Sequence, residues 1–322
     1  GGTFSADETR LLVGSDETGI FNLYEITLAD GAKKQLTTST VESYYPVDYV
    51  PGMSALIYSA DKGGNEIDHL YLLEDNGKTT DLTPGENNKV SFFKWSEDKK
   101  SMFYISNIRD PKYFDVYKMN IGEWIPTLFY ENKSGLDVNE ISDDEKTLVV
   151  SKTVTTSENE LYLVNKETGT QTELSLPDQK GRYGVSGFSK DNKYVFYLTD
   201  GGKEFTYLVQ YDMNSGERKV LYETNWDVMY TFLSEKETYR VIAINEDGKN
   251  TIIMQDAASG KTIDFPAIPD GDILGVEISD SEKLMRLSVG TSKAPNNIYL
   301  YNLETKELKK LTESLNKEIN AD

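Results

Sequence analysis

An all-β fold built from a sevenfold repeat is predicted by three observations. A short polar turn returns about every 45 residues along the 322-residue chain. Each turn is followed by short runs of β-branched and aromatic residues, which is the composition of strands. No segment before the tail has the periodicity of a helix. Four runs in each repeat predict a seven-bladed β-propeller of four-stranded antiparallel blades.

The polar turns set the count of blades. Six copies keep a serine at the first position, and the second copy is the degenerate Pro51-Gly52-Met53-Ser54. The serine copies begin at Ser5, Ser96, Ser142, Ser189, Ser234 and Ser279. The strands expected directly after the turns are 10–14, 55–59, 101–105, 147–151, 194–198, 239–243 and 284–288.

The next two runs complete each blade. Five copies of the following run carry a tyrosine that we interpret as part of the core, because packing between blades explains a repeated aromatic side chain better than recognition does. These are Tyr24, Tyr71, Tyr117, Tyr162 and Tyr299. Hairpin dipeptides such as Asp30-Gly31 and Asn76-Gly77 precede the last strand of the blade.

Both ends of the chain are expected to fall at blade boundaries, so that no blade combines strands from the two ends. The propeller is expected over 1–312, and 313–322 is expected to be a C-terminal linker. The blades are expected at about 1–40, 41–86, 87–133, 134–179, 180–226, 227–271 and 272–312.

Strand direction identifies a working surface. We call face X the end of the sheet at which the first strand of each blade begins. Because strand direction alternates, the loop between the second and third strands returns to face X. Both chain ends are expected at face X as well. Function on rigid scaffolds concentrates in loops. The predicted face X loops are 16–19, 61–68, 107–114, 153–159, 200–205, 245–249 and 291–296.

Composition excludes several classes of function. The 54 acidic residues outnumber the 34 basic ones and give a net charge of -20, which repels nucleic acid. No apolar stretch approaches the ~20 residues of a membrane span, and no leader opens the chain. A soluble protein is therefore expected, in either a reducing or an oxidising compartment, with no nucleic-acid or membrane partner. The absence of cysteine leaves both compartments open.

Three chemical motifs are better explained by structure. Ser96 and Lys99 form an S-x-x-K pattern, but they lie in a repeated turn. The sole histidine, His69, has no partner ligand nearby in the sequence and is interpreted as a surface or strand-edge residue. The acidic loops 61–68 and 245–250 lack the spacing of a calcium loop. We predict no metal, no cofactor and no catalytic residue.

Several segments nevertheless resemble one family. The run Asp61-Lys62-Gly63-Gly64-Asn65-Glu66 with the following His69-Leu70-Tyr71-Leu72, and the run 106–117, resemble blades of bacterial prolyl oligopeptidase-family serine peptidases, of the acylaminoacyl peptidase or dipeptidyl peptidase kind. Leu311-Thr312-Glu313-Ser314 is similar to the segment that precedes their α/β-hydrolase domain. TolB-type propellers share some of these elements but usually have six blades.

The resemblance implies a propeller that packs on an α/β-hydrolase domain in the same parent chain and restricts access to small peptide substrates. The parent would be a serine peptidase. This chain alone has no nucleophile-elbow pattern G-x-S-x-G, since Gly184-Val185-Ser186-Gly187-Phe188 lacks the correct spacing. The chain by itself is therefore expected to gate and not to react.

Four residues are candidates for contacts with substrate or with the second domain: Glu66, Arg109, Asp110 and Tyr113. Arg109 could bind a peptide carboxylate or carbonyl group, and Glu66 a peptide amine. The structural alternative is that Arg109 pairs with Asp110, Asp115 or a neighbouring acidic loop. A free-standing TolB-like interaction scaffold is the second functional hypothesis. A propeller lyase or glycosidase is the weakest, because no cluster of histidines or carboxylates is evident.

Overall fold

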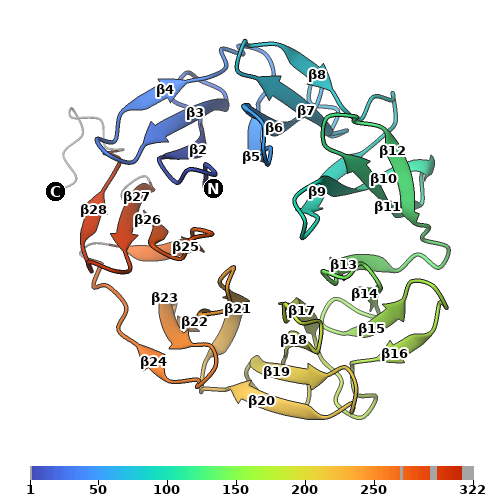
Figure 1. Ribbon diagram of the computed structural model, residues 1–322. Helices are drawn as coiled ribbons and strands as arrows, with labels where there is room; N and C mark the ends of the chain where they lie inside the picture. Colours follow the sequence, from blue (N-terminus) through green and yellow to red (C-terminus); the bar gives the residue numbers. More distant parts are fainter. Residues whose placement is uncertain (1, 269–270, 291–295, 314–322) are drawn as a thin grey trace. The chain divides into compact units, whose positions relative to one another are not determined.

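Every regular element that the structure describes is a β-strand. The structure is a computed structural model, which describes residues 2–268, 271–290 and 296–313. Its 28 strands form seven four-stranded antiparallel sheets, each made of four consecutive strands in sequence order (Figure 1). No described sheet combines strands from the two ends of the chain. The predicted seven-bladed β-propeller without a shared closing strand is confirmed.

The chain divides into two compact units, residues 1–136 and 137–322. The first unit holds blades 1 to 3. Blade 1 is β1 (Gly2–Phe4), β2 (Arg10–Ser15), β3 (Asn22–Thr27) and β4 (Lys33–Gln35). Blade 2 is β5 (Tyr45–Tyr49), β6 (Ala55–Ala60), β7 (His69–Glu74) and β8 (Thr79–Asp81). Blade 3 is β9 (Val90–Trp95), β10 (Ser101–Asp110), β11 (Tyr113–Asn120) and β12 (Pro126–Tyr130).

The second unit holds blades 4 to 7. Blade 4 is β13 (Asp137–Ile141), β14 (Thr147–Thr153), β15 (Asn159–Asn165) and β16 (Gln171–Glu173). Blade 5 is β17 (Tyr183–Phe188), β18 (Tyr194–Thr199), β19 (Tyr207–Asp212) and β20 (Arg218–Tyr222). Blade 6 is β21 (Asp227–Leu233), β22 (Tyr239–Glu246), β23 (Lys249–Asp256) and β24 (Thr262–Ile263). Blade 7 is β25 (Asp272–Ile278), β26 (Leu284–Gly290), β27 (Asn297–Asn302) and β28 (Leu308–Lys310).

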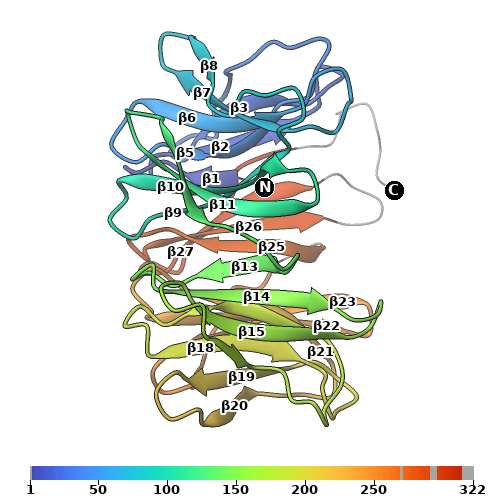
Figure 2. The ribbon, with the colours of Figure 1, turned by 90° about the vertical axis from the view of Figure 1, so that its right-hand side faces the viewer.

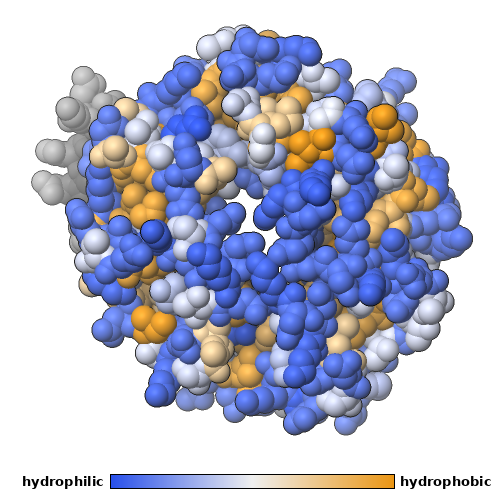
Figure 3. Space-filling model, viewed as in Figure 1, coloured by the Kyte–Doolittle hydropathy of each residue, from blue (hydrophilic) through white to orange (hydrophobic). Residues whose placement is uncertain are grey.

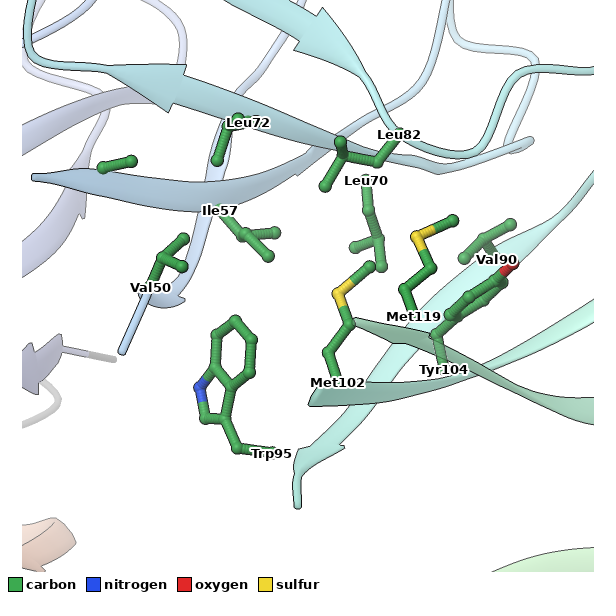
Figure 4. Close-up of a cluster of buried hydrophobic side chains, with 11 residues drawn as sticks. Val50, Ile57, Leu70, Leu72, Leu82, Val90, Trp95, Met102, Tyr104 and Met119 are labelled. Carbon is green, nitrogen blue, oxygen red and sulfur yellow. The ribbon is translucent and has the colours of Figure 1, made fainter. Parts of the chain in front are cut away.

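Apolar side chains fill the space between neighbouring sheets within each unit. In the first unit, Ile57 and Leu70 of blade 2 meet Met102 and Trp95 of blade 3 in one buried cluster (Figure 4). In the second unit, sheets such as those of β15 and β19 lie one above the other (Figure 2). Because neighbouring sheets share no strand, burial of these side chains is the main attraction between blades.

The polar turn between the first and second strands is a fixed structure. In blade 1 the Ser5 hydroxyl accepts a hydrogen bond from the Arg10 amide at 3.0 Å and donates one to Asp7 at 2.5 Å. The bond to the amide recurs at Ser96, Ser142, Ser189, Ser234 and Ser279. The fourth residue of each serine turn has a positive φ although none is glycine: Glu8, Lys99, Glu145, Asn192, Glu237 and Glu282.

In the second unit, these fourth residues connect adjacent blades. Glu282 of blade 7 accepts from the Lys236 amide of blade 6 at 2.8 Å, and Glu237 accepts from the Lys190 amide of blade 5 at 2.7 Å. Asn192 of blade 5 accepts from the Asp143 amide of blade 4 at 3.0 Å. We call this contact the inter-blade turn bond. It is made at all three junctions within the second unit. It explains why a residue with a side chain occupies this position, although glycine would adopt the positive φ at a lower cost in free energy.

The first unit is connected differently, through one aspartate on an inner strand. The Asp48 carboxylate of blade 2 accepts from the Thr3 hydroxyl of blade 1 at 3.0 Å and from the Trp95 indole of blade 3 at 2.9 Å. Burial raises the pKa of Asp48, and these two donors oppose that shift. Asp48 lies where the register of β5 against β6 shifts, a bulge that the sequence analysis did not foresee.

Replacement of Glu282 by alanine should test the inter-blade turn bond. Glu282 is 9% exposed and accepts from two amides, of Lys236 and Thr238. We expect Glu282→Ala to lower the free energy of unfolding by about 1–3 kcal/mol in urea titrations, because partly buried amides lose their acceptor. Glu282→Gln keeps an acceptor and should lower the free energy of unfolding by less. The exposed Glu307 supplies the control. Equal stability of Glu282→Ala and Glu307→Ala would contradict the role.

Acid should weaken the turns. Hydrogen bonds from Ser5 and Thr9 lower the pKa of Asp7 to about 2, and the Ser96 and Ser189 hydroxyls likewise lower the pKa of Asp98 and Asp191. A carboxyl whose pKa is lower in the folded than in the unfolded chain stabilises the fold above the unfolded pKa of about 4, and this contribution is lost as the pH falls. We therefore expect the Tm to fall between about pH 4 and pH 2. Asp7→Asn should flatten that slope, and an unchanged slope would refute the assignment.

Candidate functional site

The four predicted contact residues lie in two loops of the first unit, at the face X ends of their blades. Glu66 is in the loop between β6 and β7 of blade 2. Arg109, Asp110 and Tyr113 lie at the tip of the β10–β11 hairpin of blade 3. The structure therefore brings three of the four together on one hairpin and places Glu66 on the neighbouring blade.

Arg109 is anchored to a buried carboxylate. Its Nε donates to Oδ2 of Asp115 at 2.6 Å and its Nη2 donates to Oδ1 at 2.9 Å. Asp115 is fully buried and also accepts from the Asn132 amide at 2.7 Å. The hydrogen bonds that Arg109 donates to the Asp115 carboxylate raise the pKa of Arg109 and keep the guanidinium charged. The pair fits the structural alternative stated above, because a buried carboxylate requires a compensating charge.

One edge of the Arg109 guanidinium remains available beyond that pair. Its side chain is 32% exposed, and Nη1 is 3.6 Å from the Glu131 carboxylate. Nη2 also donates to the Asn132 carbonyl oxygen at 3.0 Å. Arg109 can therefore meet a ligand only from a fixed direction, through the edge that carries Nη1.

The other hairpin residues shape the tip. The Asp110 carboxylate accepts from the Lys112 amide at 2.9 Å and so closes the turn between β10 and β11. The Tyr113 ring packs against Gly135, where an added Cβ would lie 3.1 Å from the ring, at a φ of +67°. Any side chain at position 135 would displace Tyr113, so glycine is required there for steric reasons as well as for its φ.

Glu66 is exposed and has a positive φ of 58°. Its amide donates to the Asp61 carboxylate at 2.9 Å, which fixes the turn and leaves the Glu66 carboxylate at the surface. Among the described residues, no charged side chain forms an ion pair with it. The charged group of Glu66 is therefore presented directly to solvent.

The residues set aside in the sequence analysis have structural partners. His69 is 8% exposed, with Nδ1 2.8 Å from Asp81 Oδ2 and Nε2 3.0 Å from the Gly85 carbonyl oxygen. The expected surface or strand-edge position was wrong, because both ring nitrogens find partners that permit burial. Ser96 donates to Asp98 as a turn residue. Among described residues, no three acidic or histidine side chains gather where they could hold a metal ion.

Exposed apolar side chains collect at the face X ends of the blades, which the sequence analysis missed. Most of the large exposed apolar residues lie there: Phe21, Val41, Tyr45 and Ile108 in the first unit, and Val154, Met229 and Leu274 in the second. Val41 is 81% exposed, and the Phe21 and Tyr45 rings lie 5.3 Å apart. Large apolar residues in otherwise polar loops were the available signal. The surface elsewhere is largely hydrophilic in the view of Figure 3.

The fold and this surface define an all-β propeller domain with exposed apolar side chains at the face X ends of its blades. Over residues 48–314 the chain matches the family model described as the prolyl oligopeptidase N-terminal beta-propeller domain. The chain therefore belongs to the family of prolyl oligopeptidase N-terminal β-propeller domains. The loop 291–296 and the linker 313–322 of the sequence analysis lie largely outside the described residues. The described residues include no helix suited to crossing a membrane.

Solved structures support the fold. A structure from a study of two prolyl endopeptidases and the role of inter-domain dynamics in their catalysis and specificity matches with a TM-score of 0.75 and 17% identity. Prolyl oligopeptidase B of Galerina marginata matches with a TM-score of 0.70 and 13% identity. The matches cover 99% of this chain, but only 50% and 51% of those chains. This chain thus spans about half the length of these peptidases.

A different propeller also matches. TolB of Acinetobacter baumannii has a TM-score of 0.56 and 13% identity, with 95% of this chain and 77% of that chain covered. No curated protein matches by sequence.

Replacement of Arg109 should show whether it is primarily an anchor. Because Asp115 would be left buried without its charge partner, we expect Arg109→Ala to lower the Tm by several degrees in thermal melts. Arg182→Ala is the control, since Arg182 is exposed and contacts only the Thr156 carbonyl oxygen with its guanidinium. Arg109→Ala with an unchanged Tm would show that the pair does not support the hairpin.

Proposed function

We propose that this propeller packs through face X on an α/β-hydrolase serine peptidase domain of the same parent chain and gates the access of peptides to it. The observation that carries the proposal is the collection of exposed apolar side chains at face X, in a chain whose family is defined by peptidase propellers. Contiguous apolar surface on a soluble domain marks an interaction site.

The direction of the strands favours the same face. The first strand, β1, starts at face X, and the last strand, β28, ends there. A domain joined to either end would then be connected at the face X end of blade 1 or of blade 7. The predicted linker, 313–322, would make this connection at the C-terminal end.

Peptide contacts are proposed for the two loops that carry the predicted residues. The exposed Glu66 carboxylate suits a peptide amine, and the Nη1 edge of Arg109, which lies 3.6 Å from Glu131, suits a carbonyl or carboxylate group. Asp110 and Tyr113 would act by holding the hairpin tip that presents Arg109. Gating then requires no reactive residue in this chain, because the loops only select what passes.

The second candidate is a free-standing scaffold that binds a partner protein through face X. The similarity to TolB of Acinetobacter baumannii favours it, because the match covers 77% of that chain against about half of the peptidases. The lower TM-score of 0.56 against 0.75 ranks this reading second. The two hypotheses use the same surface and differ in its occupant.

Docking can be measured with the hydrolase domain supplied in trans. We expect the chain to form a complex with that domain in analytical ultracentrifugation, and Val41→Glu with Tyr45→Glu to weaken it at least about tenfold, because a buried charge opposes association. Ile125 is 65% exposed in the turn between β11 and β12, at the opposite end, so Ile125→Glu is the matched control.

Peptide cleavage gives the second readout. The complex should prefer short peptides more strongly than the hydrolase domain alone. The absence of both a complex and a change in size preference would refute gating and leave the scaffold hypothesis. A complex weakened equally by Ile125→Glu would refute the assignment of face X.

A further inference from the structure

A cleft of about 660 Å³ opens between blades 1 and 2, at the opposite end of the sheets from face X. It lies entirely within the first unit, where β3 and β4 face blade 2 (Figure 1). Its walls include the turn after β1, the turn after β5 and the turn after β7. The volume is in the range of sites for small ligands.

Blade 2, which forms one wall of the cleft, lacks the inter-blade turn bond. In the turn of blade 2, the Met53 amide donates to the Val50 carbonyl oxygen, just as the Glu8 amide donates to the Ser5 carbonyl oxygen in blade 1. Met53 therefore occupies the fourth turn position, from which Asn192, Glu237 and Glu282 make the inter-blade turn bond. Pro51 and Gly52 form this turn with a φ of +72° at Gly52, as in a type II turn. Met53 therefore has no positive φ, and its thioether is a poor acceptor.

The matching donors of blade 1 are consequently unused. In blades 4, 5 and 6, amides of the second or third turn residue donate to an oxygen of the next blade. The corresponding amides of blade 1 are those of Ala6 and Asp7, which are exposed at the cleft and have no hydrogen-bond acceptor among the described residues. They form a preformed site for a carbonyl oxygen.

The wall of the cleft that blade 2 forms carries acidic and apolar side chains, in contrast to the amide donors of blade 1. Glu74 lines the cleft, and its Oε2 is shielded from solvent and accepts no hydrogen bond in the described part of the chain, although Lys78 Nζ lies 3.4 Å away. Asp75 is adjacent and exposed. Buried apolar residues, Leu56 and Leu73, line the cleft between these polar groups. This wall suits a cation attached to an apolar body.

We propose that the cleft binds the amino-terminal end of a short peptide with apolar side chains. A peptide carbonyl oxygen accepts from the Ala6 and Asp7 amides in place of the missing turn bond, and the terminal ammonium group pairs with Glu74. A neutral carbonyl fits better than a carboxylate because the Asp7 carboxylate is near, and the neutral Asn192 amide fills the same role between blades 4 and 5. This site does not depend on the function proposed for face X.

The first test is a titration of the ¹⁵N-labelled chain, followed by NMR, with Leu-Leu-Ala amide and with its N-acetylated form. We expect the amide signals of Ala6 and Asp7 to shift on addition of the free-amine peptide. The acetylated peptide should bind at least about tenfold more weakly, since it lacks the charge. Unmoved Ala6 and Asp7 signals at millimolar peptide, or equal binding of both forms, would overturn the proposal.

Two variants locate the site. Glu74→Gln should weaken the free-amine peptide about tenfold, whereas Glu86→Gln, at an exposed acid outside the cleft, should not. Exchange of the turn for that of blade 7 should restore the bond to blade 1, raise the Tm and abolish peptide binding. That variant carries Val50→Ser, Pro51→Asp, Gly52→Ser, Met53→Glu and Ser54→Lys. Retained binding in the folded exchange variant, or equal effects of Glu74→Gln and Glu86→Gln, would refute the site.

Discussion

The rest of the structure depends on one constraint, that neighbouring blades share no hydrogen-bonded strand. Each described sheet consists of four consecutive strands, so adjacent sheets within a unit meet through side chains, turns and a few main-chain hydrogen bonds to loops, such as that from the Val90 amide to the Asp68 carbonyl oxygen. Apolar clusters supply most of the attraction, but burial is not directional. A few polar contacts therefore fix how one blade sits on the next. In the second unit these are the inter-blade turn bonds, and in the first unit Asp48 bonds to both neighbours of its blade.

The repeat could be predicted because its signals are local. The serine of each turn bonds an amide five residues later, and the strands that follow take their composition from burial on both faces. The contacts between blades could not be predicted, because Glu282 and Lys236 lie 46 positions apart and only the packing of the sheets brings them together. One signal was available: in five of the six serine turns, an acid or amide stands at the fourth position, where glycine adopts the positive φ at lower cost.

The candidate site, too, could be predicted only where its signals are local. The sequence indicated the β10–β11 hairpin and the charge of Arg109, but not that Asp115 is fully buried beneath it. Because Asp115 is buried, Arg109 serves first as its charge partner and so supports the hairpin. A contact between Arg109 and a ligand is secondary to that role. The apolar side chains at face X escaped notice because they are spread singly over loops and strand ends of several blades. Phe21 and Tyr45 become neighbours only through the pairing of blades 1 and 2.

The turn of blade 2 shows how a local choice of residues has consequences between blades. A non-glycine residue at positive φ costs about 1–2 kcal/mol, and six turns accept that strain. In three of them the side chain gains a bond to the preceding blade that offsets it. Pro51 and Gly52 remove the strain, because glycine adopts the positive φ freely. Met53 then stands at the fourth position with a thioether, which is a poor acceptor, so the relaxed turn lines the cleft without a turn bond to blade 1.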